Sequence, residues 1–282
     1  MLFSTQFLNS EISETMKKYY FFFAIVIIGL FAFRSKEPVT EILPNNIVVN
    51  GKLFTSLFQQ HAAEYKALCF QAYNIARFQV DQSLQKTSSK PRAVITDIDE
   101  TLLDNSPYAI HQALKGKVYE SITWEDWTGR SQCDTLAGSL SFCKYAANKG
   151  IEVYYITNRA EKERKGTLQN LLRFGFPFAD SDHMIFKQSV SSKESRRQNV
   201  ASTHEIVLFL GDNLADFTDV FDKKSTEERI LATQQLSTEF GRKFIILPNA
   251  NYGDWESALF KYNFKLTSEQ KDSVIKTCLN NY

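Results

Sequence analysis

The sequence places two aspartates, Asp97 and Asp99, directly after the apolar stretch 93–96. A short run of apolar and β-branched residues predicts a buried strand, and open α/β sheets bind ligands at the carboxyl ends of their strands. Two carboxylates this close resist ionising together, so their pKa values are expected to split. One aspartate can then be an anionic nucleophile and the other a protonated acid. An Asp-rich surface turn is the weaker alternative, because turns seldom follow a buried-strand run.

Three further segments carry polar groups that fit one chemistry. Thr157 and Asn158 follow the apolar run 151–156, and Asp212 and Asp216 follow the apolar run 206–210. The third segment contains Lys193, which a Ser191-x-x-Glu194 capping box predicts to lie in the first turn of a helix. In phosphoryl transfer a carboxylate attacks phosphorus, an acid protonates the leaving oxygen, and a hydroxyl, an amide and an ammonium hold phosphate oxygens. Carboxylates also supply the oxygen ligands of Mg²⁺, which neutralises charge as the phosphoryl group moves. Taken alone, Lys193 could be a solvated surface lysine and Asp216 a helix N-terminal residue favoured by the dipole.

Predicted strands and helices alternate along the chain that positions these residues. The strands cover residues 93–96, 151–156, 184–186, 206–210 and 243–247. Helices are predicted over 53–84, over 134–149 with Asp134 as N-cap and Gly150 as stop, over 160–174 closed by Gly175, and from about residue 193. The alternation predicts an α/β fold with a parallel sheet flanked by helices. Segments around 53–90 and 108–132 are predicted to add a small helical cap region.

Residues 1–34 are predicted to be an export signal or an N-terminal anchor. Lys17 and Lys18 precede an apolar run over 19–33, which as a helix would span about 22 Å, short of the roughly 30 Å bilayer core. A basic flank and a short apolar core are typical of export signals, although no A-x-A cleavage site follows. Residues 35–50 are predicted to be a linker to one domain over 51–282. We therefore expect an exported protein of the periplasm or outer envelope, either released or associated with the membrane through its N-terminus.

Composition narrows the class of partner. The net charge is +1, so no strong field favours a nucleic acid polymer. Four cysteines could pair in three ways in an exported protein, but buried free thiols are the favoured interpretation: Cys69, Cys133, Cys143 and Cys278. The oligomeric state is not predicted.

In their order along the chain, these motifs resemble the haloacid dehalogenase (HAD)-like phosphatases. The stretch 97–101, Asp-Ile-Asp-Glu-Thr, matches the family's D-x-D-x-T, Thr157 and Lys193 stand for its second and third motifs, and 211–216 stands for its fourth. Residues 50–265 are more closely similar to class C acid phosphatases of the lipoprotein e(P4) type. This resemblance implies a Rossmann-type core and a magnesium-dependent acid phosphatase acting on phosphomonoesters, with 5′-nucleotides favoured. A lipoprotein of this type should carry a Cys at the end of its export signal, where this chain has Phe33.

The resemblance also implies a role for each motif residue. Asp97 would be the nucleophile that forms an aspartyl-phosphate, and Asp99 the general acid and base. Mg²⁺ would be held by Asp97, the backbone carbonyl of Asp99 and Asp212, with support from Asp216, and the phosphate by Thr157, Asn158 and Lys193.

Four aromatic side chains are candidates for stacking on a nucleobase: Trp124, Tyr252, Tyr108 and Trp127. Core packing is an equal alternative for each, and Trp124 and Tyr252 are preferred because they lie in segments that resemble the substrate pocket of the class C branch. Two other functions stay open. One is the same chemistry on another phosphomonoester; the other is a non-catalytic binding or storage protein, which would have no use for a nucleophile.

Overall fold

The computed structural model describes residues 46–282, so the prediction for residues 1–34 and most of the linker lies outside the described range. The last linker residues are helical, because α2 spans Ile47–His61 and the Asn46 side chain accepts a hydrogen bond from the Val49 N–H at 3.2 Å. No helix within residues 46–282 is both long enough and apolar enough to cross a membrane.

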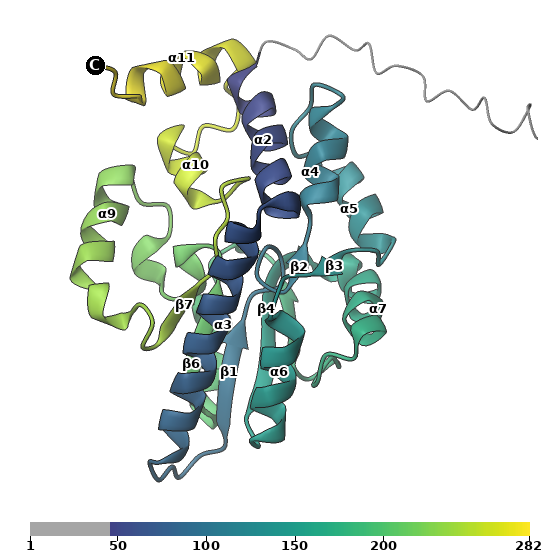
Figure 1. The fold of residues 1–282 in the computed structure, drawn as a ribbon, viewed down its shortest axis with the longest axis vertical. Helices are drawn as coiled ribbons and strands as arrows, with labels where there is room; N and C mark the ends of the chain where they lie inside the picture. The colour runs from purple at the N-terminus through teal and green to yellow at the C-terminus, as the bar shows by residue number, and fades with distance from the viewer. Residues whose placement is uncertain (1–45) are drawn as a thin grey trace, which may run out of the picture. The chain divides into compact units, whose positions relative to one another are not determined.

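A five-stranded parallel sheet is the centre of the fold (Figure 1). Its strands, in spatial order, are β5 (Met184–Lys187), β4 (Glu152–Ala160), β1 (Arg92–Thr96), β6 (Glu205–Gly211) and β7 (Phe244–Ile246). The predicted α/β class with a parallel sheet is therefore confirmed. The central strand β1 pairs with both β4 and β6, so the residues that follow these three strands meet at one edge of the sheet.

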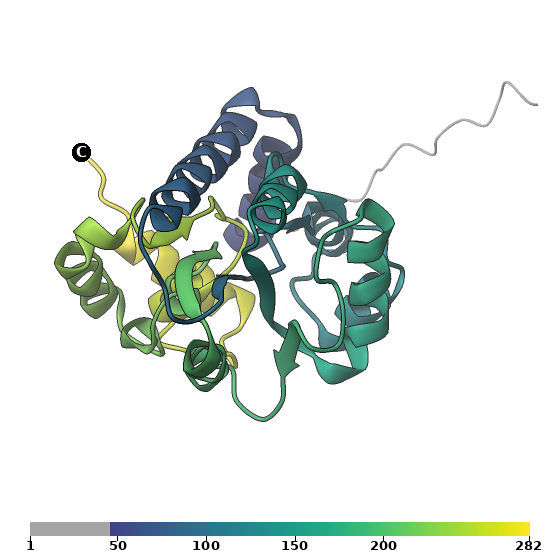
Figure 2. The same cartoon turned by 90° about the horizontal axis from the view of Figure 1, so that it is seen from below.

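Alternating side chains along each strand build a core on both faces of the sheet. The larger core contains Val94, Tyr155 and Leu208 and is covered by α3 (Ala63–Leu84) and α6 (Ser139–Asn148), which cross in front of the sheet in Figure 1. The smaller core packs Ile95 and Ile156 against Val200 of α8 (Glu194–Thr203). Figure 2 shows the same layers turned by 90°.

Two helix predictions need correction. The helix predicted over 53–84 is two helices, α2 and α3, because Ala62 between them is extended (ψ 127°). The helix predicted from Asp134 begins only at Ser139, after Gly138 with φ 91°. Asp134 cannot cap it because Asp134–Thr135 (β3) pairs with Leu103–Asp104 (β2) in a small antiparallel ribbon.

A separate layer lies beyond the carboxyl ends of the strands. The segment predicted as cap over 108–132 contains α4 (Ser106–Ala113) and α5 (Ser121–Gly129). In the segment around 53–90, by contrast, α3 flanks the sheet. Helix α5 packs tightly on α7 (Arg164–Phe174), since a Cβ on Gly166 would lie 2.4 Å from the Thr128 carbonyl oxygen. The remaining helices are α9 (Thr226–Gln235), α10 (Asp254–Leu259), α11 (Ser268–Cys278) and the short 3₁₀ turns Glu161–Glu163, Leu214–Asp216, Asp219–Phe221 and Ser237–Glu239.

Candidate active site

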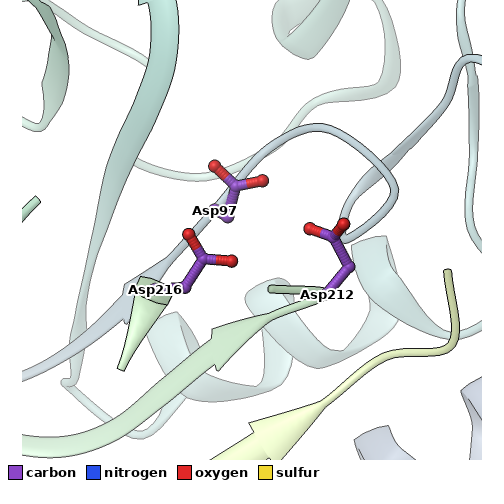
Figure 3. A group of neighbouring side chains, drawn as sticks. All are labelled: Asp97, Asp212 and Asp216. Carbon is purple, nitrogen blue, oxygen red and sulfur yellow. The ribbon is translucent and has the colours of Figure 1, made fainter. Parts of the chain in front are cut away.

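Three carboxylates meet where β1 and β6 end. Oxygen atoms of Asp97, Asp212 and Asp216 all lie within 4.8 Å of one another, and Figure 3 shows the three side chains converging from the two strand ends. The backbone fixes this arrangement, because the Asp97 N–H donates to the Leu210 carbonyl at 2.9 Å. Asp97 and Asp216 are buried and Asp212 is half-buried. The Asp99 side chain lies outside this group of three.

One ammonium group faces the three carboxylates. Lys193 Nζ contacts the Asp97 carboxylate and lies 2.6 Å from Asp216 Oδ1. Burial raises the pKa of Asp97 to about 7, with Asp216 and Asp99 adding to the rise and Lys193 opposing it. Burial and the charges of Asp216 and Asp97 also raise the pKa of Asp212. Three clustered carboxylates, two of them buried, face one cation. Their oxygens are the ligands that a hard divalent cation takes.

Metal-free protein is expected to lose thermal stability as pH rises from about 4 to about 7. The folded-state pKa of Asp97 is raised from 3.8 to about 7, so in this window the folded chain keeps a proton that the unfolded chain has released, and the free energy of unfolding falls with pH. Each kcal/mol lost should lower Tm by about 2–4 °C. Melting curves in chelator at pH 5 and 7.5 measure the slope, and Asp97→Asn should reduce it. Equal Tm values for the wild type would contradict this account.

Gly211 makes room for Asp216. A Cβ at position 211 would lie 2.4 Å from Asp216 Oδ2 and 2.5 Å from Asp216 Cβ. Asp216 is also held in place by its own turn, where its Oδ2 accepts the Asn213 N–H at 3.0 Å. The residue at 211 therefore has to be glycine for the third carboxylate to approach the other two.

Gly211→Ala is expected to lower the affinity for Mg²⁺ by tenfold or more, which corresponds to about 1.4 kcal/mol. The added methyl group displaces Asp216 from the carboxylate group. Calorimetric titration with Mg²⁺ measures the change, and Gly51→Ala, at a helical glycine whose Cβ would meet nothing within 4 Å, controls for loss of a glycine in general. Unchanged affinity would mean that Asp216 does not contribute to the cation site.

Asp99 is held by a buried arginine. Arg159 Nη2 donates to Asp99 Oδ1 at 2.7 Å, and Arg159 Nε lies 3.1 and 3.2 Å from the two carboxylate oxygens. Asn105 Nδ2 donates to Oδ1 at 2.8 Å. Oδ1 therefore has two close donors, whereas Oδ2 has only the longer contact and is the oxygen better placed to exchange a proton. Neither Arg159 nor Asn105 was assigned a role from the sequence, although Arg159 directly follows the predicted phosphate-binding pair.

The predicted phosphate ligands lie near the carboxyl end of β4 and at the start of α8. Thr157 is buried and Asn158 is exposed, both within β4, which runs four residues further than predicted. The Thr157 hydroxyl oxygen accepts the Arg159 N–H at 3.0 Å, so its own hydrogen is free to be donated. Lys193 is the N-cap residue of α8 and its side chain makes no capping hydrogen bond, so the predicted capping box through Ser191 is wrong. The Glu194 N–H donates instead to Ser192 Oγ at 3.4 Å.

A cavity of about 410 Å³ opens above these groups. Nine of the predicted site residues line it, namely Asp97, Asp99, Tyr108, Trp124, Asn158, Lys193, Asp212, Asp216 and Tyr252. Thr157 and Trp127 are not among its lining residues. Trp127 is half-buried against the larger core, and its Nε1 donates to Asn105 Oδ1 at 2.9 Å, so it supports the asparagine that holds Asp99.

Aromatic side chains form the outer wall of the cavity. Trp124 meets Tyr108 edge to face with ring centroids 5.0 Å apart, and Tyr119 lies 5.9 Å from Trp124. Tyr119 lines the cavity but was missed in the sequence, where nothing separates it from other surface tyrosines. Tyr108 is tied down through its hydroxyl, 3.0 Å from Thr123 Oγ1. Trp124 lies between these two tyrosines and the Arg159 guanidinium, which is 5.8 Å from its ring centroid.

Tyr252 has a second role besides lining the cavity. Its hydroxyl donates to Glu100, whose carboxyl group is buried and also accepts the Asn105 N–H at 2.8 Å. Burial raises the pKa of Glu100 to about 8, with the charge of Asp99 adding to the rise. Removing the Tyr252 side chain would leave a buried carboxyl group with one partner fewer, so Trp124 gives the cleaner test of stacking.

All four cysteines are unpaired, with Cys69, Cys133 and Cys143 buried and Cys278 exposed. The prediction of buried free thiols is therefore confirmed for Cys69, Cys133 and Cys143, whereas Cys278 is free but exposed.

The parallel sheet and the carboxylate site at its edge suit phosphoryl transfer, and comparisons with known proteins give the family. A sequence model of the HAD superfamily, subfamily IIIB (acid phosphatase), matches residues 38–255. The chain belongs to this family, as the resemblance implied.

Solved structures are similar over nearly their whole length. The class C acid phosphatase from Bacillus anthracis is 42% identical with a TM-score of 0.81, covering 83% of this chain and 99% of that one. A second structure of the Bacillus anthracis enzyme, with tungstate bound, is equally similar and 98% covered. Acid phosphatase 1 of Solanum lycopersicum is 32% identical over 82 residues, which span 29% of this chain and only 32% of the tomato protein.

Proposed function

We propose that this protein is a magnesium-dependent acid phosphatase that hydrolyses phosphomonoesters through an aspartyl-phosphate on Asp97. One observation carries the proposal: the buried Asp97 carboxylate lies at the end of the central strand within 4.8 Å of Asp212 and Asp216 and in contact with Lys193. The tungstate bound to the Bacillus anthracis enzyme, an oxyanion of phosphate-like shape, supports an anion site in this family.

The residues divide the reaction between them. Asp97 attacks phosphorus and forms an acyl phosphate, while Asp99 gives a proton to the leaving oxygen. Asp99 then takes a proton from water, which attacks the phosphorus and frees Asp97. Lys193, Thr157 and Asn158 hold the phosphate oxygens throughout.

The cation site would consist of the carboxylates of Asp97 and Asp212 and the backbone carbonyl of Asp99, with Asp216 in support. Bound Mg²⁺ would neutralise charge on the phosphoryl group as it is transferred.

Phosphate release from a panel of nucleotides, sugar phosphates and nitrophenyl phosphate, with Mg²⁺ and after chelation, tests this function. We expect turnover that is best below neutral pH and that is lost on chelation. Release that is insensitive to chelation would reject the metal requirement, and binding of phosphate esters without turnover would favour a binding or storage protein. Preference for a sugar phosphate would keep the chemistry and change the substrate.

We propose 5′-nucleotides as the preferred substrates because Tyr108, Tyr119 and Trp124 line the same cavity as Asp97 and Asp99. Trp124→Ala is expected to lower kcat/KM for adenosine monophosphate about tenfold, since stacking of a base on an aromatic ring is worth roughly 1–3 kcal/mol. Glycerol phosphate has no base to stack and should be affected little. Steady-state kinetics on the two substrates measures the difference, and an equal loss on both would mean that Trp124 only packs against its neighbours.

We further propose that the protein is exported and acts in the periplasm or outer envelope, released or held to the membrane by residues 1–34. Cell fractionation with phosphatase assay distinguishes the two forms. Activity confined to the cytoplasmic fraction would reject export.

A further inference from the structure

One arginine outside the cavity joins the two segments that carry the phosphate ligands. Arg196, on α8, donates from Nη1 to the Thr157 carbonyl at 2.6 Å and from Nη2 to Asn158 Oδ1 at 2.7 Å. The same Nη2 lies 3.2 and 3.1 Å from the carbonyl oxygens of Ser191 and Ser192. Arg196 is half-buried and is not among the residues that line the cavity, so it reaches the site only through its neighbours.

The guanidinium decides which end of the Asn158 amide faces the cavity. A guanidinium has five N–H donors and no acceptor, so the amide atom that meets it has to be the oxygen. With Oδ1 turned to Arg196, the amide nitrogen Nδ2 is the end left for the cavity that Asn158 lines. An N–H₂ group attracts a phosphate oxygen, whereas the carbonyl oxygen of the flipped amide would repel it.

We propose that Arg196 is a positioning residue for phosphate binding: it orients the Asn158 amide with its N–H₂ toward the substrate and ties that residue to the loop before Lys193. The inference rests on the proposed function, in which Asn158 binds phosphate. The guanidinium plane and its fork of donors suit this task, because a single ammonium cannot serve the Thr157 carbonyl and the Asn158 amide in the same geometry.

A double-mutant cycle on binding of inorganic phosphate, in Mg²⁺ buffer, tests the inference by calorimetry. Arg196→Met should weaken phosphate binding about tenfold, the effect of losing one hydrogen bond to a charged group. Asn158→Ala should weaken it by a similar factor. Because Arg196 acts through Asn158, the double variant should bind phosphate no more weakly than Asn158→Ala alone. In kinetics the KM should rise more than kcat falls.

Arg164→Met is the matched control, since Arg164 is also half-buried and donates to a carbonyl, that of Met184, at 3.1 Å. It should leave phosphate affinity unchanged. If Arg196→Met does not fold, Arg196→Lys keeps the charge and should still weaken binding several-fold.

Two outcomes would overturn the positioning role and leave the proposed function standing. One is an additive loss of phosphate affinity in the double variant. The other is full phosphate affinity in Arg196→Met or Arg196→Lys when Asn158→Ala binds phosphate more weakly. Full affinity in Asn158→Ala would instead remove Asn158 from the phosphate site, and the inference with it.

Discussion

Asp97→Asn is expected to lower phosphate release by about 10⁵-fold or more, the scale on which loss of a nucleophile acts in other covalent enzymes. An amide cannot form the acyl phosphate, and Asp216, the other carboxylate in contact with Lys193, follows β6 and not the central strand. The loss should fall on kcat for every substrate, because the same bond to phosphorus forms whatever the leaving group. Single-turnover assays of phosphate release measure it.

The fold should survive this change. Lys193 keeps Asp216 as its partner at 2.6 Å, and one of three crowded carboxylates becomes neutral, so metal-free Asp97→Asn should melt no lower than the wild type at neutral pH. Asp182→Asn is the control, since Asp182 is exposed and lies in the turn before β5, at the opposite end of the sheet. Release within tenfold of the wild type in folded Asp97→Asn would reject a covalent mechanism.

Asp99→Asn is expected to slow hydrolysis by about 10²–10⁴-fold for substrates with poor leaving groups, the usual contribution of general acid catalysis. An alkyl oxygen needs the proton that Asp99 supplies, whereas nitrophenolate leaves without one. Formation of the aspartyl-phosphate from nitrophenyl phosphate should therefore be slowed much less. Burst kinetics separates this step from the later attack of water, for which Asp99 is also needed.

The controls for Asp99→Asn depend on Arg159, which donates hydrogen bonds to the Asp99 carboxylate. Asp99→Asn still lets Arg159 donate to an amide oxygen, but it removes the negative charge that pairs with this buried guanidinium, so Tm should fall and is measured beside the kinetics. Arg159→Lys, in contrast, disturbs the forked contact to both Asp99 oxygens without removing the acid. Equal losses on alkyl and nitrophenyl phosphates in the first step would contradict a role for Asp99 as acid.

Much of the fold could be predicted because its signals are local. Apolar runs marked all five strands of the sheet, and glycine correctly marked the end of α7, where Gly175 adopts φ 76°. The helix predicted from Asp134 failed because a pairing with β2, some thirty residues earlier in sequence, took the backbone that a helix would have used. Local patterns carry no information about such a partner.

In the active site, too, features set by local sequence could be predicted and contacts between distant residues could not. Asp97 and Asp212 could be placed because the ends of neighbouring parallel strands have to meet. Lys193 was placed by its resemblance to the third motif of the family, since the capping box predicted around it is wrong. The contacts of Asp99 with Arg159, of Glu100 with Tyr252 and of Asn158 with Arg196 could not, because each joins residues 38 to 152 positions apart. Tyr252 and Trp127 show the limit most clearly. Both are aromatic, both were candidates for stacking and both donate a hydrogen bond to a buried side chain, but only Tyr252 lines the cavity.

The chain builds its reaction centre and its aromatic wall in different places. The first depends on the sheet edge, where even a methyl group at Gly211 would displace a carboxylate. The second is carried mainly by α4 and α5, a segment inserted between β1 and β4. On the proposed function, exchange of the cavity-lining side chains Tyr108, Tyr119 and Trp124 should alter which esters are accepted without touching the three carboxylates. In enzymes of this architecture, substrate specificity can therefore change while the catalytic residues stay the same.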